Sequence, residues 1–445
     1  MRRSPQPFAG FITIATLAGL LLPVASVWAA DDLLSIYERA RTSDPEFQQA
    51  LADRQAREEA LPQARAGLRP QVSLESAYQT IDTDSDIGTQ QDVRYEQLNY
   101  GVSLSQPLYR YSQARRVDQT SAQVEQARAE FTFAEQALIL RAAERYFAVL
   151  DAREAVDAAE ASLQAIERQL EQAEQRFEVG VIARTDVEEA KAQSDLARAS
   201  LLQSRDDLES QREALRELTN QAPALLASVR EGASLNSPEP ADPSQWRDRA
   251  QEDNRELLAA QFAAQAAMEG IDVERGARFP QLDIVANYSG VDQYEREDSD
   301  PSSDQWSAGI ELSMPLYQGG GIRSSVREAQ FRYTEAREVL EQTRRSVSRD
   351  AANAYRGALT ALERVRALDQ ARVSTQAALD ATEAGFEVGT RTIVDVLNAQ
   401  RERFNAERDY EQARHAYLVN TLRLKQAAGT LSVADLRRVN ALLSD

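Results

Sequence analysis

Few residue types in this sequence could carry catalytic or metal chemistry. The chain of 445 residues contains no cysteine and a single histidine, His415. Because a zinc site needs several imidazole or thiolate ligands together, we expect His415 to be a core or surface residue. Aspartate and glutamate are spread along the whole chain, and no pair stands out as a catalytic dyad. The sequence therefore predicts no enzyme, no metal site and no cofactor.

Partners that carry phosphate are also disfavoured. Three consecutive glycines, 319–321, could suggest a phosphate-binding loop, but no lysine-serine pair follows them. Their position shortly after Pro315 makes a strand-to-helix turn the better interpretation. The formal net charge is −20, whereas nucleic acid is bound by basic surfaces. We expect no nucleic-acid partner.

Two nearly identical segments contain the most informative residues. Segments 176–180 and 385–389 read Arg-Phe-Glu-Val-Gly and Gly-Phe-Glu-Val-Gly, and they lie 389 − 180 = 209 residues apart. Asp186 recurs as Asp395 at the same offset. A fixed offset that persists across several residue types indicates that one structural unit was duplicated.

The polar residues after each turn have a local interpretation. Thr392 with Asp395, and Thr185 with Glu188, have the spacing of a helix capping box. A carboxylate in the first turn of a helix is also favoured by the helix dipole. Taken alone, these residues predict the starts of two helices.

The amino terminus has the pattern of a secretory signal peptide. Residues 1–30 contain two arginines, then an apolar run, then small residues at a cleavage point after Ala29 or Ala30. No later stretch reaches the roughly 18 apolar residues that a membrane-spanning helix needs. Any membrane insertion must therefore use strands.

Long helices dominate the rest of the chain. Segment 113–177 contains no proline or glycine, and its apolar residues recur every seven positions, at Val117, Val124, Phe131 and Leu138 and again at Val156, Leu163, Leu170 and Phe177. This heptad pattern predicts a coiled-coil helix over 113–178, on the order of 100 Å long. A return helix is expected over 184–219, with a half-helix in the segment before the strands, 32–66. The second repeat has a half-helix within 246–276, a long helix over 322–386 and a return helix over 392–428.

Each repeat changes from period seven to period two in its strand region. Leu98, Tyr100 and Val102 alternate with polar or small residues, and Trp306 and Ile310 behave likewise. Such alternation is typical of a transmembrane strand, with lipid on one face and water on the other. The sequence predicts β-hairpins over 71–106 and 281–314. A soluble sandwich hairpin is the alternative, but two hairpins could not cover their own faces in a chain of long helices.

About four strands per chain are too few to close a membrane barrel, which needs roughly eight. An open strand edge is not tolerated in lipid, so the chain must oligomerise. A dimer would supply about 8 strands and a filled interior, whereas a trimer would supply about 12 and leave a passage. Small and polar inward residues favour the trimer. The expected organisation is a signal peptide (1–30), a first repeat (31–225), a proline-rich linker (226–245) and a second repeat with a C-terminal segment (246–445).

With these features, the whole mature chain resembles the TolC family of outer-membrane efflux and secretion channels. The most specific run is 389–397, Gly-Thr-Arg-Thr-Ile-Val-Asp-Val-Leu, supported by 107–109, 315–320 and 428–431. The resemblance implies a homotrimer with a 12-stranded barrel in outer-membrane lipid and a helical tunnel across the periplasm. It also implies docking to a periplasmic adaptor protein and an inner-membrane pump of the RND, ABC or MFS type.

The resemblance also implies a gate at the periplasmic tip. The gate residues carried over by matching motif are Thr185 and Asp186 in the first repeat and Phe386, Arg391, Asp395 and Asn398 in the second. The turn residues expected to dock the adaptor and pump are Gly180, Val181, Gly389 and Thr390. Threefold symmetry would place three copies of Asp395 at the axis, as a cation-binding constriction open to block by divalent cations. Arg391 is expected to pair with Asp186 or Thr185.

Two residues depart from the pattern of close family members. Asn398 stands where an aspartate is frequent, which leaves one aspartate ring and predicts weaker divalent block. Phe386 stands where a tyrosine is frequent, so one polar contact of the closed state would be missing.

Three functions compete for this sequence. The leading one is a passive exit duct for efflux or type I protein secretion. A trimeric adhesin also combines a barrel with coiled coils, but its strands lie together at the C terminus, whereas here two hairpins lie about 210 residues apart. A soluble periplasmic scaffold is the third. The sequence does not indicate which cargo or which pump is used.

Overall fold

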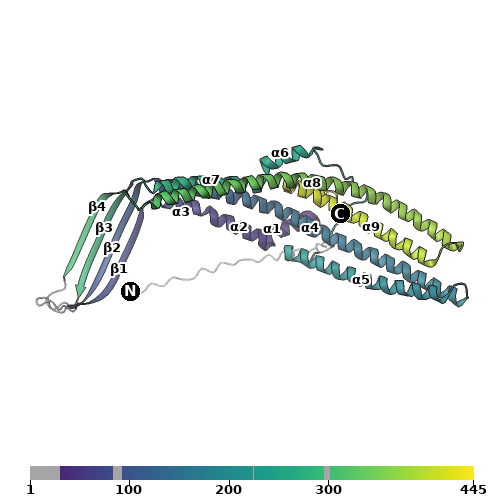
Figure 1. The fold of residues 1–445 in the computed structure, drawn as a ribbon. Coiled ribbons are helices and arrows are strands. Elements are labelled where there is room, and N and C mark those ends of the chain that lie inside the picture. Colours follow the sequence, from purple (N-terminus) through teal and green to yellow (C-terminus); the bar gives the residue numbers. More distant parts are fainter. Residues whose placement is uncertain (1–30, 84–92, 224, 295–300, 445) are drawn as a thin grey trace, which may run out of the picture.

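The computed structural model describes residues 31–83, 93–223, 225–294 and 301–444, so the expected signal peptide lies outside the described residues. The chain is elongated, with a sheet at one end and two helical hairpins that reach the other end side by side (Figure 1). The sheet contains β1 (Gln71–Thr83), β2 (Val93–Arg110), β3 (Gln281–Tyr294) and β4 (Ser302–Ser313). The helices of the first half are α1 (Leu33–Ser43), α2 (Pro45–Glu58), α3 (Ala60–Ala66), α4 (Tyr111–Glu178) and α5 (Arg184–Thr219). Those of the second half are α6 (Pro243–Asp253), α7 (Arg255–Gly276), α8 (Gly321–Glu387), α9 (Ile393–Ala427) and α10 (Val433–Asn440).

The helices α4 and α8 run nearly the length of the helical part. They have 68 and 67 residues, which at 1.5 Å per residue corresponds to roughly 100 Å each. Figure 1 shows α5 and α9 folding back along α4 and α8, and each pair is joined by a short turn. The mostly helical fold class predicted from the heptads is thus confirmed.

The segments that precede the strands are interrupted helices. Asp44 ends α1, and its side chain accepts a hydrogen bond from the Phe47 amide at the start of α2. Pro45 then occupies the first helical position, where a missing N–H costs nothing. Asn254 divides α6 from α7 in the same way, accepting from the amides of Glu256 and Leu257. The expected half-helices are therefore three helices and two helices, and α6 begins at Pro243, inside the expected linker.

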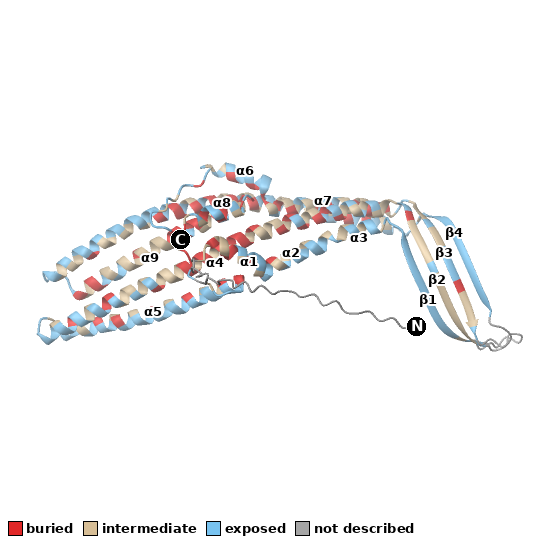
Figure 2. Cartoon of the chain, turned by 180° about the vertical axis from the view of Figure 1, so that it is seen from behind, coloured by how far each residue is buried: buried red, intermediate tan, exposed pale blue. Residues whose placement is uncertain are grey.

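The four strands form one antiparallel sheet in the order β1-β2-β3-β4. The two hairpins are therefore joined through β2 and β3, whose register is broken by a bulge between Pro107 and Tyr109. Leu74 lies opposite Val102, and Tyr288 lies opposite Trp306, on one apolar face. In the isolated chain this face is open to solvent, and Figure 2 shows β1 and β4 as exposed.

The core lies midway along the helices, where α1, α4, α9 and α10 meet (Figure 2). Tyr146 is completely buried there, and its hydroxyl donates to the Ala227 carbonyl at 2.6 Å. Short bridges pair Asp31 with Leu226 and Val229 with Leu443, which ties both ends of the described chain to the segment between the repeats.

Candidate functional site

Both helical hairpins end in the same turn geometry. At the end of α4, the Gly180 amide donates to the Phe177 carbonyl at 2.9 Å and the Val181 amide to the Arg176 carbonyl at 2.9 Å. The end of α8 repeats this pattern, with Gly389 donating to Phe386 at 3.1 Å and Thr390 donating to Gly385 at 2.8 Å. These are the paired bonds of a Schellman motif.

Glycine is required at both turns. The φ angle is +71° at Gly180 and +78° at Gly389, a left-handed conformation that side chains with a Cβ rarely adopt. The neighbouring Val181 is 69 % exposed. The four expected docking residues therefore lie at the outer end of the helical part, at the opposite end of the molecule from the sheet (Figure 1).

The second turn leads into the capping box that the sequence predicted. Thr392 precedes α9, and the Asp395 amide donates to its hydroxyl oxygen at 3.3 Å. In return, the Thr392 amide and hydroxyl both donate to one Asp395 carboxylate oxygen at 2.9 Å. The hydrogen bond from the Thr392 backbone and that from its side chain lower the pKa of Asp395. Asp395 therefore carries its charge throughout the physiological pH range.

The first turn lacks the capping box expected between Thr185 and Glu188. Ala183 occupies the capping position of α5, and no side chain caps this helix. Ala183 stands at the position of Thr392 in the repeat, since 392 − 183 = 209, so the hydroxyl is missing from the place where it is needed. Thr185 is exposed in the first turn of α5, and Glu188 instead pairs with Arg184 at 3.6 Å.

Arg391 does not contact its expected partners within one chain. Its side chain crosses Gly385 so closely that a Cβ at Gly385 would lie 2.8 Å from the Arg391 Cγ. Neither Asp186 nor Thr185 is bonded to it in the described part of the chain. Asn398 is exposed at the start of α9, where its side-chain oxygen accepts from Arg401 at 3.1 Å.

The two hairpins contact each other just behind the turns. A small apolar cluster joins Ile166 of α4 to Ile393 and Leu397 of α9, and Phe386 packs against it. Nearer the turn, the guanidinium carbon of Arg176 lies 4.5 Å from the centroid of the Phe386 ring. Arg176 is not among the gate residues expected from the sequence. The signal was present, because Arg176 is the residue that differs between the two five-residue segments.

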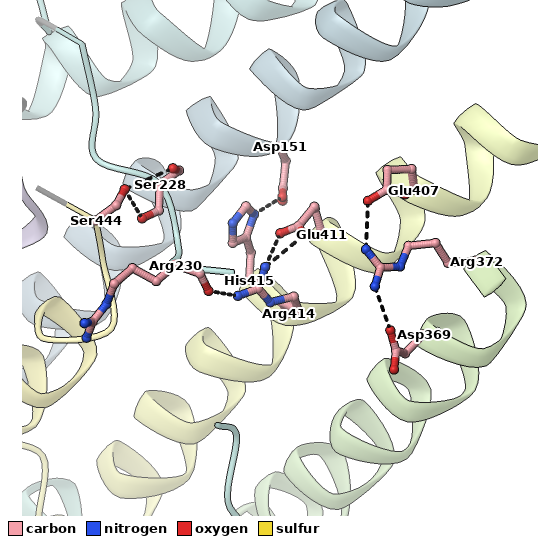
Figure 3. Close-up of polar contacts among 10 residues, drawn as sticks. All are labelled: Asp151, Ser228, Arg230, Asp369, Arg372, Glu407, Glu411, Arg414, His415 and Ser444. Carbon is pink, nitrogen blue, oxygen red and sulfur yellow. Dashed lines mark hydrogen bonds and ion pairs between the residues drawn. The ribbon is translucent and has the colours of Figure 1, made fainter. Parts of the chain in front are cut away.

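The single histidine belongs to the core, one of the two places expected for it. His415 is 2 % exposed and stacks on Phe147 with ring centroids 5.1 Å apart. Its Nδ1 lies 2.6 Å from a carboxylate oxygen of Asp151 on α4 (Figure 3). Beside it, buried Arg414 donates to Glu411 at 2.7 Å and also to the Arg230 carbonyl. These bonds tie α9 to α4 and to the segment between the repeats.

Two searches of the described residues were negative. No group of three or more histidine, cysteine, aspartate or glutamate residues within the described ranges is arranged to hold a metal ion. None of the helices in these ranges combines the length and apolar character needed to cross a membrane.

The sequence matches proteins whose names give a location and a role. The profile of the family described as outer membrane efflux protein matches residues 36–221 and again 246–430. The outer membrane protein TolC of Vibrio cholerae is 36 % identical over 421 residues, which cover 94 % of each chain. The alkaline protease secretion protein AprF of Pseudomonas aeruginosa is 29 % identical over 421 residues, covering 92 % of this chain and 86 % of that one.

The fold has known counterparts among solved structures. The CmeC outer membrane channel of Campylobacter jejuni superimposes with a TM-score of 0.77 at 14 % sequence identity, covering 93 % of this chain and 90 % of that one. At such low identity the likeness concerns the fold alone.

Proposed function

The chain belongs to the outer membrane efflux protein family and is an outer-membrane exit duct for efflux or secretion, and from this we propose that three copies form one tunnel gated at its helical tip. The members of this family are channel proteins, and we assign no enzymatic activity to this chain. The TolC resemblance and the outer-membrane location predicted from the sequence are confirmed by the matches.

The observation that carries the trimer is the four-stranded sheet with two free edges. β1 and β4 each pair on one side only in the described chain. The apolar face places Leu74 and Trp306 outside, each 76 % exposed, and unpaired strand edges are too costly to leave in lipid. Edge-to-edge pairing of β1 with β4 of the next copy removes both problems at once. Three copies then give about 12 strands, enough to enclose a water-filled passage.

The gate is proposed at the opposite end, where the turns of both hairpins lie together. Three copies of Asp395 would face one another around the axis, and the capping box holds each carboxylate in its ionised form. A ring of carboxylates binds cations and repels anions. Arg391, which forms no ion pair with a carboxylate among the described residues, is available to Asp186 or Thr185 of a neighbouring copy.

The proposed partners are a periplasmic adaptor protein and an inner-membrane pump of the RND, ABC or MFS type. The exposed turns containing Gly180, Val181, Gly389 and Thr390 are the surface that would meet them. The relative named for secretion of alkaline protease favours an ABC pump in a type I system, and the TolC relatives leave drug efflux equally open.

Cell fractionation and planar bilayers test the duct. We expect the mature protein in the outer-membrane fraction, protected from release by salt or urea, and we expect discrete cation-selective conductance from the purified protein. Recovery from the soluble periplasm would support the scaffold alternative instead. An outer-membrane protein without conductance would support the adhesin.

Arg391→Ser tests the gate. Loss of a pairing between neighbouring copies should raise resting conductance by about two- to fivefold, the range expected when one exposed ion pair is lost. Arg184→Ser is the matched control, because Arg184 is also an exposed arginine near a turn but pairs only within its own helix. Equal conductance of Arg391→Ser and the unchanged protein would place the gate elsewhere.

A further inference from the structure

We propose that Arg176 is a gate residue, which latches the second helical hairpin to the first through the ring of Phe386. This inference rests on the proposed gate at the helical tip. The sequence assigned Phe386 to the gate but implied that its missing hydroxyl leaves one contact of the closed state unmade. The structure places a different contact on that ring.

The contact joins the two hairpins of one chain. Arg176 lies in the last turn of α4, and its guanidinium carbon is 4.5 Å from the centroid of the Phe386 ring near the end of α8. A guanidinium within about 6 Å of an aromatic centroid is attracted by the negative face of the ring. Both side chains are half-buried, so water screens this attraction only in part.

Phe386 is the principal partner of the Arg176 guanidinium. No carboxylate among the described residues lies within ion-pair distance of Arg176. The backbone carbonyl of Arg176 is already used by the Val181 amide, which fixes the last turn of α4. The arginine is thus held in place by the turn, and its charge is directed to the other hairpin.

The ring of Phe386 is held equally well. It packs against the cluster of Ile166, Ile393 and Leu397, which joins α4 to α9. Arg176 lies 176 − 166 = 10 residues beyond Ile166 on the same helix, about 15 Å nearer the turn. The two hairpins therefore contact each other through the apolar cluster and, nearer the turns, through Arg176 and Phe386.

The Arg176 contact has no counterpart in the second repeat. Position 176 of the first repeat corresponds to Gly385 of the second, and Arg391 corresponds to Ile182. Arg176 and Arg391 thus stand at different places in the two repeats, and Arg391 lies over Gly385 while Arg176 reaches across to Phe386. Outward movement of the second hairpin would separate Arg176 from Phe386.

Resting conductance of the full-length trimer in planar bilayers tests the latch. We expect Arg176→Gln and Phe386→Leu each to raise resting conductance by about two- to fivefold, and we expect the double variant to equal either single one. Phe386→Tyr keeps the ring and should leave conductance low. Arg168→Gln is the control, because Arg168 is exposed on the same helix and, among the described residues, donates only to the Gln164 carbonyl. Unchanged conductance in Arg176→Gln, or additive effects in the double variant, would overturn the latch.

Hydrogen exchange separates failure of the latch from failure of the duct. In Arg176→Gln, amides of residues 385–397 should exchange several-fold faster than in the unchanged protein, and those in Arg168→Gln should not. Faster exchange with unchanged conductance would make the contact structural only and overturn the latch, while the proposed duct would stand. Absence of conductance in every protein, the unchanged one included, would instead refute the proposed function.

Discussion

Two aspartates at equivalent places in the repeat differ in what holds them. Asp395 is fixed by three hydrogen bonds with Thr392. Asp186 has no such partner, because Ala183 replaces the threonine. Asp395 therefore caps α9, whereas Asp186 caps no helix. Because its carboxylate is fixed, Asp395 is also a better candidate than Asp186 for a ring of carboxylates at the axis. A cap and a gate are compatible in one side chain.

Two substitutions separate the cap from the charge. Asp395→Asn keeps an oxygen acceptor for Thr392 but removes the charge, so divalent cations should block single-channel current several-fold less. Thr392→Ala leaves the carboxylate and removes the cap, which should cost about 1 kcal/mol of stability and preserve most of the block. Bilayer recordings and denaturant unfolding measure the two effects. Block that survives in Asp395→Asn would exclude Asp395 as the constriction.

The contacts of Asp435 near the C terminus are expected to weaken in acid. Its side chain is buried at 4 % exposure and bonds to Lys425, Arg438 and Ser432. Burial alone would raise the pKa of Asp435, but these hydrogen bonds outweigh it and the pKa is lowered. The contribution to stability is thus present above the unfolded pKa of about 3.9 and is lost as pH falls through the lower folded value.

We therefore expect the segment around α10 to loosen below about pH 4. Hydrogen exchange of residues 429–440 at pH 7 and at pH 3, corrected for the intrinsic rate, measures this. Asp435→Asn should loosen the segment already at pH 7 and remove most of the pH dependence. An identical pH dependence in both proteins would show that another group is responsible.

At the scale of elements, the sheet and the helices place their apolar residues differently. The sheet collects apolar residues on one face in rows set by its register, and Leu74, Val102, Tyr288 and Trp306 form one such row. The helices instead bury their apolar seams against one another midway along the chain. An apolar strand face can contact lipid over its whole width, whereas a heptad seam is a narrow stripe on an otherwise polar helix. The two patterns therefore suit different surroundings at the two ends.

The tryptophans offer a direct test of the lipid-facing row. Trp306 is 76 % exposed on the apolar face of β4, whereas Trp246 is 2 % exposed and its indole N–H donates to the Pro240 carbonyl at 2.8 Å. In vesicles with brominated acyl chains, we expect the emission of Trp306 to be strongly quenched in Trp246→Phe. In the matched variant Trp306→Phe of the mature protein, from which Trp28 is expected to leave with the signal peptide, Trp246 should be hardly affected. Equal quenching in the two variants would argue against this face meeting lipid.

At the scale of the whole molecule, both ends of the chain fit the proposed assembly of several copies. Among the described residues, β1 and β4 each pair on one side only, the apolar face of the sheet is open, and Arg391 at the tip forms no ion pair. The proposed copies around one axis would cover both ends. Cyclic symmetry satisfies both ends with a single operation.

Native mass spectrometry in detergent measures the number of copies. We expect a complex of three chains, and we expect Ile310→Arg, on the outer face of β4, to weaken it. An arginine facing the middle of the bilayer costs about 2–4 kcal/mol in membrane barrels. Gly309→Arg is the control on the opposite face of the same strand. A monomer or dimer of the unchanged protein would contradict the closed barrel.

The sequence by itself determined the fold class, the family and the doubled turn. These depend on local periods. The heptads predicted the helices α4 and α8, and the alternation of apolar and polar residues predicted the strand around Trp306. The motif at 389–397 identified the family because it is a continuous run. Even the capping box of Thr392 needed only neighbours three positions apart.

Only the tertiary structure decided which distant segments meet. The pairing of β2 with β3, the contact of His415 with Asp151 and that of Arg176 with Phe386 join residues that lie far apart in the sequence. No local period encodes such contacts, because they depend on how whole helices pack. The interruptions at Asp44 and Asn254 were missed for another reason. A capping side chain inside an apolar pattern ends a helix only when packing allows the chain to turn there.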